Sequence, residues 1–538
     1  MKLHSIITLS SLIGIASAAA TCKPSTFTIP NATVITAEHR NGNEPIPLPN
    51  TVPSCGGGPS FNVTPPVPIC RLVLDVPTSP SSSVRVEAWL PDPATWNSRL
   101  LASGTGGIGG CVDYPVLQSG TRLSFAAFGT NAGHDGAAGH ELFLGKEGVI
   151  EDFGHRAIHV EAAVARDVVR TYYGCEATKR YYQGCSTGGR QGLQEAALYP
   201  DDFDGVLVGA PGVDWLRIVA SKGILARRVG WPDIGSPAYV RPEQWRAVVA
   251  AQVAMLDGLD GVVDGVIDEP ARHRFDPQVL ACGTGVLGED VCLGAAQVGS
   301  VRRAYEPVAD EGGRIVYPAF EIGSDTGVFS DNVVDGRPEL EYTILQDFWR
   351  GAVYNDTTWT PHAFDTSQME FAVSLNPGGV NSDFTNLSAF RARGGKVLAY
   401  HGRADQTVTS ALSSEFFGKV QTTSNLTLDE MDEFYRLFFI PGMRHCSGGR
   451  GAWSIGQTWP LDGERLDGRG NALMALVAWV ENGTRVDEIV GAGYEGGDVG
   501  GGEVVAERKY CPYPLESRWD GLTNSNLSTA WECVLPID

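Results

Sequence analysis

The 538-residue sequence has no block of basic residues, and this absence excludes one class of partner. Lys and Arg total 41 against 63 Asp and Glu, which gives a formal net charge of −22, and no long run of Lys or Arg occurs anywhere. A nucleic-acid-binding surface needs clustered positive charge to release counterions from phosphates. We therefore expect no nucleic-acid partner and interpret the acidity as that of a solvated surface.

Long apolar runs are also scarce. The one near the N-terminus, residues 6–15, is too short to span a bilayer, and no later run reaches the length of a membrane span. It follows Lys2 and precedes Ala16-Ser17-Ala18, a small-residue cleavage pattern. Residues 1–20 are therefore predicted to be a signal peptide, and the mature protein is expected to be secreted and extracellular, without a membrane partner.

Glycosylation sequons fit an extracellular location. Seven Asn-x-Ser/Thr sequons occur along the chain, and any that carry glycans must lie on the surface. They are Asn31, Asn62, Asn355, Asn386, Asn425, Asn482 and Asn526.

The chain lacks the C-x-x-C and H-E-x-x-H spacings, which disfavours a zinc site. It has eleven cysteines, so in an oxidising compartment one thiol is left over after pairing. Cys282 with Cys292, and Cys511 with Cys533, are near enough in sequence to form local disulfides. Spacing alone leaves the remaining connectivity open.

No internal repeat and no low-complexity tract is present, so the organisation must be inferred from local patterns. A Pro- and Gly-rich arm extends to about residue 69 and is followed by alternating apolar segments. Strands are predicted over 71–76, 84–90, 99–103, 181–183, 205–209, 396–400 and 434–440, and helices over 152–173, 188–199 and 471–481. Alternating strands and helices predict an α/β fold with a parallel sheet and crossover helices. Residues 213–387, with irregular spacing and more Trp, Pro, Asp and Gly, are predicted to be an inserted domain.

One segment carries a nucleophile motif. Gly184-Cys185-Ser186-Thr187-Gly188 fits G-x-S-x-G, and it follows a strand-like segment and opens a helix. This is the strand-to-helix turn that holds a serine side chain out on a strained elbow, beside the free N–H groups of a helix N-terminus. Ser186 is therefore the predicted nucleophile, and a simple turn serine is the alternative.

A serine hydroxyl needs a base, and in α/β-hydrolases the partners follow the serine in the order Asp or Glu, then His. Asp405 and His445 satisfy this order, and each comes just after an apolar strand, at the sheet edge where ligands bind. His445 is the predicted base and Asp405 the residue that orients it. His401 precedes Asp405 and is predicted to be a loop or supporting residue, and His134 precedes the serine.

Two cysteines flank these residues. Cys185 comes immediately before Ser186, and Cys446 immediately after His445. If Ser186 and His445 meet in space, the two sulfur atoms come near bonding distance. A disulfide between them would clamp the elbow to the histidine loop, although either cysteine could pair elsewhere.

The oxyanion hole is assigned by the general rule for this class of enzyme. The backbone N–H of the residue after the nucleophile, Thr187, and one from the glycine-rich loop at Gly106-Gly107 are the candidates, with Gly107 chosen from the loop.

The sequence resembles the tannase and feruloyl esterase family of secreted hydrolases. The resemblance rests on Cys-Ser-Thr-Gly-Gly at 185–189, on His445-Cys446, and on Gly-Arg-Ala-Asp at 402–405, and it covers nearly the whole mature chain. It implies an α/β-hydrolase fold with a large inserted lid, so that residues 21–212 and 388–538 form the catalytic domain and 213–387 the lid.

The same resemblance implies the disulfide pairing. It joins Cys185 to Cys446 and leaves Cys175 unpaired. The other implied pairs are Cys22–Cys70, Cys55–Cys111, Cys282–Cys292 and Cys511–Cys533.

An acidic, glycine-rich stretch at 257–268 lies inside the predicted lid. Its four aspartates suit a hard cation with oxygen ligands, so Ca²⁺ is the expected ion, although the stretch does not fit the EF-hand pattern and could be plain solvated turns. The resemblance implies a structural calcium site. Its ligands would be the side chains of Asp257, Asp260 and Asp264 and the carbonyls of Val262 and Val266.

These observations predict a secreted serine esterase acting on a small or polysaccharide-linked ester of a hydroxycinnamic acid, as feruloyl esterases do. A tannase acting on gallate esters is the alternative. Many tannases of the family carry a dibasic processing site in the lid, and Arg227-Arg228 and Arg302-Arg303 are poor candidates for one. Two other classes are alternatives: a catalytically silent binding glycoprotein, which usually lacks a triad member, and a cysteine hydrolase using Cys185 or Cys175. The sequence leaves the oligomeric state open.

Overall fold

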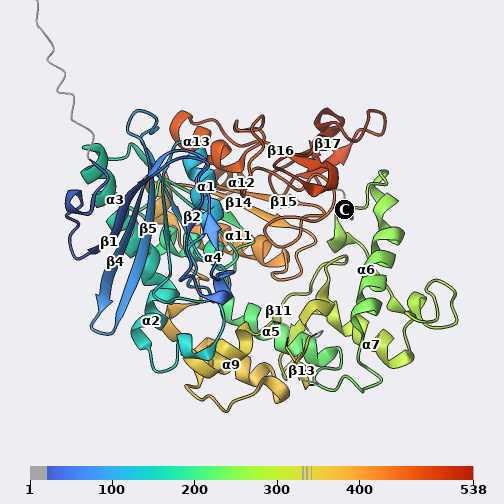
Figure 1. The fold of residues 1–538 in the computed structure, drawn as a ribbon. Coiled ribbons are helices and arrows are strands. Elements are labelled where there is room, and N and C mark those ends of the chain that lie inside the picture. The colour runs from blue at the N-terminus through green and yellow to red at the C-terminus, as the bar shows by residue number, and fades with distance from the viewer. Residues whose placement is uncertain (1–20, 330–331, 335–336, 341, 537–538) are drawn as a thin grey trace, which may run out of the picture.

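The structure is a computed structural model that describes residues 21–329, 332–334, 337–340 and 342–536 (Figure 1). Its centre is a nine-stranded sheet in the order β1-β4-β5-β7-β6-β8-β9-β14-β15. These strands are β1 (Thr33–Arg40), β4 (Ile69–Ser79), β5 (Ser82–Pro91), β6 (Arg99–Ser103), β7 (Ala126–Thr130), β8 (Lys179–Cys185), β9 (Gly205–Gly209), β14 (Lys396–Gly402) and β15 (Tyr435–Ile440). The signal peptide predicted for residues 1–20 lies outside the described residues.

The sheet is mixed, so the prediction of a parallel sheet is only partly right. The strands from β7 to β15 are parallel to their neighbours. The pairs β1–β4, β4–β5 and β5–β7 are antiparallel. The reason is local: β4 ends at Ser79 and β5 begins at Ser82, and a connection this short can join only antiparallel strands.

Helices cover both faces of the parallel strands. Val206 and Val397 point into a core shared with α3 and α4, whereas the next residues along, Leu207 and Leu398, point into a core shared with α13. This alternation follows from the two-residue period of a strand. The helices outside the inserted segment are α1 (Tyr114–Arg122), α2 (Glu147–Glu151), α3 (Ala157–Tyr173), α4 (Thr187–Leu198), α11 (Ala411–Ser424), α12 (Leu428–Asp432) and α13 (Ala472–Asn482).

The segment between β9 and β14 forms a helical region beside the sheet (Figure 1). Part of it has a core of its own around Trp245, Val248 and Val301, whereas Trp215 and Phe348 pack into the main core. Its elements are α5 (Trp215–Arg228), α6 (Pro242–Leu256), α7 (Ala295–Ala304), β10 (Val308–Ala309), β11 (Ile315–Tyr317), β12 (Asn332–Val334), β13 (Arg337–Glu339), α8 (Ile344–Phe348), α9 (Thr366–Leu375) and α10 (Ser388–Ala392). The lid boundaries at 213 and 387 stay a prediction.

Small two-stranded units complete the fold. One lies near the N-terminus and two lie in the C-terminal region, where β16 and β17 stand near the end of β15 (Figure 1). They are β2 (Ile46–Pro47) with β3 (Asn62–Val63), β16 (Ile489–Tyr494) with β17 (Val504–Tyr510), and β18 (Glu516–Trp519) with β19 (Trp531–Val534). None of the described helices has both the length and the apolar character needed to cross a membrane.

Five disulfides cross-link the chain with the pairing that was predicted. They are Cys22–Cys70, Cys55–Cys111, Cys185–Cys446, Cys282–Cys292 and Cys511–Cys533. Cys175 is exposed and unpaired. Because Cys185 is disulfide-bonded, it has no thiolate to act as the nucleophile of a cysteine hydrolase.

Candidate active site

Ser186 lies on a sharp turn between β8 and α4. Its backbone has φ 62° and ψ −122°, a conformation that non-glycine residues rarely adopt. Its N–H donates to the Gly209 carbonyl at 2.9 Å, and its own carbonyl accepts from Gly212 N–H at 3.1 Å. A Cβ at Gly184 would lie 2.6 Å from the Gly188 carbonyl oxygen, so this turn needs glycine there. The predicted strand–turn–helix context is present.

Asp405 and His445 lie together at the carboxyl edge of the sheet. They follow the neighbouring parallel strands β14 and β15. His445 Nδ1 lies 2.7 Å from Asp405 Oδ2. Asp405 is 1% exposed, and the His445 side chain is 18% exposed. With Nδ1–H donating to Asp405, Nε2 of His445 is left to act as a base.

The Asp405 carboxylate is surrounded by donors. Its Oδ1 accepts from the backbone N–H groups of Thr407 at 2.7 Å and Val408 at 2.8 Å, and its Oδ2 lies 3.3 Å from His401 Nε2. Burial alone would raise the pKa of Asp405, but the charge of His445 and hydrogen bonds from His401 and His445 lower that pKa below its usual range. Asp405 is therefore ionised and can orient and stabilise a protonated His445.

His401 and His134 have supporting positions. His401 lies in β14 rather than in a loop, and its buried ring contacts Ser413 Oγ at 2.7 Å and the Val408 carbonyl at 2.9 Å. It holds the Asp405 turn. His134 is buried, and its Nε2 lies 2.7 Å from the Ile108 carbonyl, where it fixes the glycine-rich loop.

The disulfide Cys185–Cys446 joins the elbow to the histidine loop. The two Cα atoms are 6.0 Å apart across 261 residues of chain. Ser186 follows Cys185 and His445 precedes Cys446, so the disulfide holds the serine elbow and the histidine loop next to each other. Among the described hydrogen bonds there is none between Ser186 Oγ and the His445 ring, and such catalytic bonds are often long before substrate binds.

The predicted oxyanion loop is tied to the elbow through the Thr187 side chain. Thr187 Oγ1 donates to the Gly107 carbonyl at 2.8 Å and accepts from Trp215 Nε1 at 2.9 Å. Gly107 has φ 59°, a left-handed conformation that suits glycine. Thr187 is the first residue of α4, so its N–H has no acceptor within the helix.

Sequence reasoning missed one buried charge near Asp405. Lys222 in α5 is fully buried, and its Nζ donates to the Thr407 carbonyl and lies 4.5 Å from the centre of the Phe320 ring. Burial lowers the pKa of Lys222 to about 7. A single lysine in a helix is usually exposed, so no sequence signal marked this one.

The candidate calcium stretch has carboxylate groups that fit a cation. Asp257 Oδ1 accepts from three backbone N–H groups, those of residues 264, 265 and 266. Asp260 Oδ1 accepts from Val262 N–H at 2.9 Å, and its Oδ2 is buried without a hydrogen-bond partner in the described chain. Burial and the neighbouring Asp268 raise the pKa of Asp260 to about 7. Arg508 pairs with Asp268, but no described cationic side chain forms an ion pair with Asp257, Asp260 or Asp264, and crowded carboxylates of this kind suit a hard cation.

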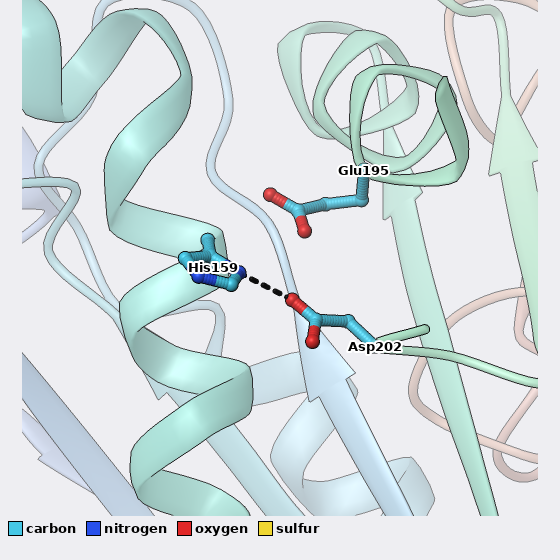
Figure 2. Close-up of side chains that lie close together, drawn as sticks. All are labelled: His159, Glu195 and Asp202. Carbon is cyan, nitrogen blue, oxygen red and sulfur yellow. Dashed lines mark hydrogen bonds and ion pairs between the residues drawn. The ribbon is translucent and has the colours of Figure 1, made fainter. Parts of the chain in front are cut away.

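A second cluster of titratable groups lies between α3 and α4. One ligating atom from each of His159, Glu195 and Asp202 falls within 4.8 Å of the others (Figure 2). Asp202 already pairs through one oxygen with His159 at 2.6 Å and through the other with Arg166 at 2.7 Å. Burial raises the pKa of Glu195 well above its usual value. Asp202 therefore has two partners, whereas Glu195 Oε2 is buried without a hydrogen-bond partner among the described residues.

All seven predicted glycosylation sites are exposed. The asparagines concerned are Asn31, Asn62, Asn355, Asn386, Asn425, Asn482 and Asn526. Their positions are compatible with attached glycans.

Together, the mixed sheet, the serine elbow and the Asp–His pair after successive strands define an α/β-hydrolase. The family model described as "Tannase and feruloyl esterase" matches residues 70–534. The chain therefore belongs to the tannase and feruloyl esterase family and is a carboxylic ester hydrolase. This assignment favours an enzyme over the silent binding glycoprotein.

The similarity to known proteins extends over nearly the full length of the chain. The chain is 35% identical over 507 residues to a protein named "Probable feruloyl esterase B-2" from Aspergillus terreus, covering 94% of this chain and 93% of the relative. A crystal structure of feruloyl esterase B from Aspergillus oryzae superposes with a TM-score of 0.86 at 33% identity, covering 95% and 98% of the two chains. Tannin acyl hydrolase from Aspergillus niger has a TM-score of 0.74 at 20% identity, covering 96% and 95%, and shows a shared fold.

Proposed function

We propose that this protein is a secreted feruloyl esterase, which hydrolyses esters of hydroxycinnamic acids through Ser186, His445 and Asp405. The observation that carries the proposal is the Cys185–Cys446 disulfide. It holds the serine elbow against the loop of the Asp405–His445 pair.

In the first half of the reaction, Ser186 Oγ attacks the ester carbonyl carbon while His445 Nε2 accepts the hydroxyl proton. The carbonyl oxygen becomes negative and receives hydrogen bonds from the N–H groups of Thr187 and Gly107. The C–O bond to the alcohol then breaks, and the protonated His445 gives its proton to the departing oxygen. Asp405 stabilises the imidazolium between these two steps.

The second half repeats these steps with water. His445 Nε2 takes a proton from a water molecule, and the resulting hydroxide attacks the acyl-enzyme carbonyl. The bond to Ser186 Oγ breaks, Oγ recovers its proton from His445, and the free aromatic acid leaves.

The choice of a hydroxycinnamate rests on the relatives. Three relatives at 34–36% identity are named "Probable feruloyl esterase B", "Probable feruloyl esterase B-1" and "Probable feruloyl esterase B-2", whereas the tannin acyl hydrolase is 20% identical and supports the fold alone. The proposed substrates include small esters and aromatic acids linked to polysaccharides.

We also propose that the protein leaves the cell through the signal peptide at 1–20, carries glycans on the exposed sequons and binds one structural Ca²⁺. Asp257, Asp260 and Asp264 would supply side-chain oxygens for the ion, and Val262 and Val266 would supply carbonyl oxygens. Bound Ca²⁺ would neutralise the crowded carboxylates and hold this stretch in one conformation. No step of ester hydrolysis requires it.

The test is hydrolysis of methyl ferulate and methyl gallate by the purified protein, with Ser186→Ala as the control. We expect ferulate to be released faster than gallate, and both activities to be lost in S186A. A preference for gallate would make the enzyme a tannase, and equal activity in S186A would contradict the mechanism.

A further inference from the structure

A cavity of about 430 Å³ opens beside the loops that carry Asp405 and His445. One wall comes from α6 and the stretches 265–267 and 322–325 of the inserted segment. The other wall comes from residues 403–404, which precede Asp405, and from Gly442, Arg444, Gly449 and Arg450, which flank His445. The cavity is therefore next to both residues without containing either side chain in its lining.

Four arginines line this cavity, and three of them have no protein partner. Arg403 is neutralised by Glu321 at 2.6 Å and Glu269 at 2.8 Å. The guanidinium groups of Arg246, Arg444 and Arg450 form no ion pair or hydrogen bond within the described residues. All three side chains are at the exposed surface of the cavity.

The local charge is opposite to that of the molecule as a whole. The chain has a net charge of −22, so three unpaired arginines in one cavity form a positive site on an acidic protein. Asp325 also lines the cavity and lies near Arg246 and Arg444. With Glu269 and Glu321 on Arg403, three carboxylates stand against the four arginines, which leaves an excess of one positive charge. A guanidinium binds a carboxylate through two parallel hydrogen bonds, so this site suits an anion of that shape.

The position of the cavity indicates which part of an ester would reach it. His445 gives its proton to the departing alcohol oxygen, so the alcohol part must lie on the His445 side of the scissile bond. Arg444 precedes His445 directly. The alcohol part therefore departs on the side of the histidine loop, which also contributes Arg444 to the cavity lining, whereas the acyl group stays bonded to Ser186.

We propose that this cavity is a subsite for a carboxylate on the alcohol part of the substrate, such as the carboxylate of a uronic acid sugar. The inference rests on the proposed function and deepens it, because it names the chemical class of the alcohol. Arg246 and Arg450, from opposite walls, hold the carboxylate.

The test uses two feruloyl esters that differ only in the sugar, methyl glucoside or methyl glucuronide, acylated at the same secondary hydroxyl. We expect kcat/KM to be about tenfold higher for the glucuronide at low salt, with the preference falling as salt rises. The double variant Arg246→Gln and Arg450→Gln should bring the ratio of the two kcat/KM values close to one. The matched control, Arg170→Gln and Arg302→Gln, removes two surface charges that pair with Glu176 and Asp276 and should keep the native ratio.

Equal kcat/KM values for the two esters in the native protein, or an unchanged ratio in the double variant, would overturn the subsite. Failure of the proposed function is separately visible, because it would abolish hydrolysis of methyl ferulate as well. In that case, calorimetric titration with methyl glucuronide tests whether the cavity binds a carboxylate. Binding by the native protein that is lost in the double variant supports the subsite. Absence of binding to the native protein overturns it.

Discussion

The buried carboxylate of Asp405 is surrounded by four hydrogen-bond donors. Two backbone N–H groups, His401 and His445 all point at it. The backbone donors fix the orientation of the carboxylate, so its second oxygen is left facing His445. The residue order Ser, Asp, His identified Asp405 in the sequence, but His401 and Lys222 could not be assigned in this way. Their roles depend on contacts with the turn at 407–408 that only the folded chain creates.

Asp405→Asn tests this arrangement. The amide oxygen can still accept from Thr407 and Val408, so we expect the fold to be kept, but an amide nitrogen facing His445 cannot accept its Nδ1–H. We expect kcat to fall by about 10³- to 10⁴-fold. Asp202→Asn is the matched control, because Asp202 also pairs with a histidine, His159, away from the site. Equal losses of kcat in both variants would contradict the assignment.

The same residue predicts a dependence of stability on pH. The folded protein holds the pKa of Asp405 below the value near 3.9 of an unfolded aspartate. The carboxylate therefore stabilises the fold above about pH 4, and this contribution is lost as the pH falls through the folded pKa. We expect the unfolding free energy of D405N to decrease less than that of the native protein between about pH 5 and pH 3, as measured by urea unfolding. A steeper decrease in D405N would contradict this account.

At the scale of elements, strand boundaries were predicted most accurately where a short apolar run ends in turn residues. The strands at 99–103 and 205–209 match β6 and β9 residue for residue. The edge strand β1 was missed because Ile35 is exposed and no side chain of the strand is fully buried, so no alternating apolar pattern marks it. The predicted helix over 152–173 begins with a π-helical turn, Asp152–Arg156, before α3, a local widening that helical spacing does not reveal.

The Cys185–Cys446 disulfide links the serine elbow to the histidine loop. We expect its removal to reduce catalysis more than the removal of any other disulfide. Replacing Cys185 and Cys446 with alanine is expected to lower the unfolding free energy by about 2–5 kcal/mol. It should also lower kcat by about 10²-fold, because the nucleophile and base lose their alignment. Urea unfolding and single-turnover kinetics would measure the two effects.

The control for that variant removes Cys282 and Cys292, a disulfide in the inserted segment. We expect a loss of stability there with kcat retained. If both double variants keep the native kcat at a temperature where they are folded, the clamp does not align the site.

At the scale of the whole molecule, the residues that form the site come from three distant parts of the chain. The sequence pattern was enough to identify the class of fold, the triad candidates and the disulfide pairs, since each has a local motif or a family resemblance. The arginine cavity has neither. Arg246 and Arg450 come together only because the inserted segment packs on the loop after β15, and no spacing along the chain encodes that contact.

Calcium removal tests a property of the whole molecule. If Ca²⁺ binds at 257–266, a chelator should lower the melting temperature, and added Ca²⁺ should restore it. At a free Ca²⁺ concentration of a hundred times Kd, the stabilisation amounts to about 2.7 kcal/mol. Asp257→Asn should lose this response while keeping kcat at temperatures where the protein is folded. A melting temperature that does not respond to the chelator or to Ca²⁺ would contradict the site.

The central claim is that Ser186 is the nucleophile activated by His445. The most direct measurement is reaction with diisopropyl fluorophosphate followed by peptide mass spectrometry, in the native protein and in His445→Ala. The account predicts one phosphoryl adduct per chain, on Ser186, in parallel with loss of esterase activity, and a much slower reaction in H445A. An adduct on another residue, or full activity in protein modified at Ser186, would contradict it.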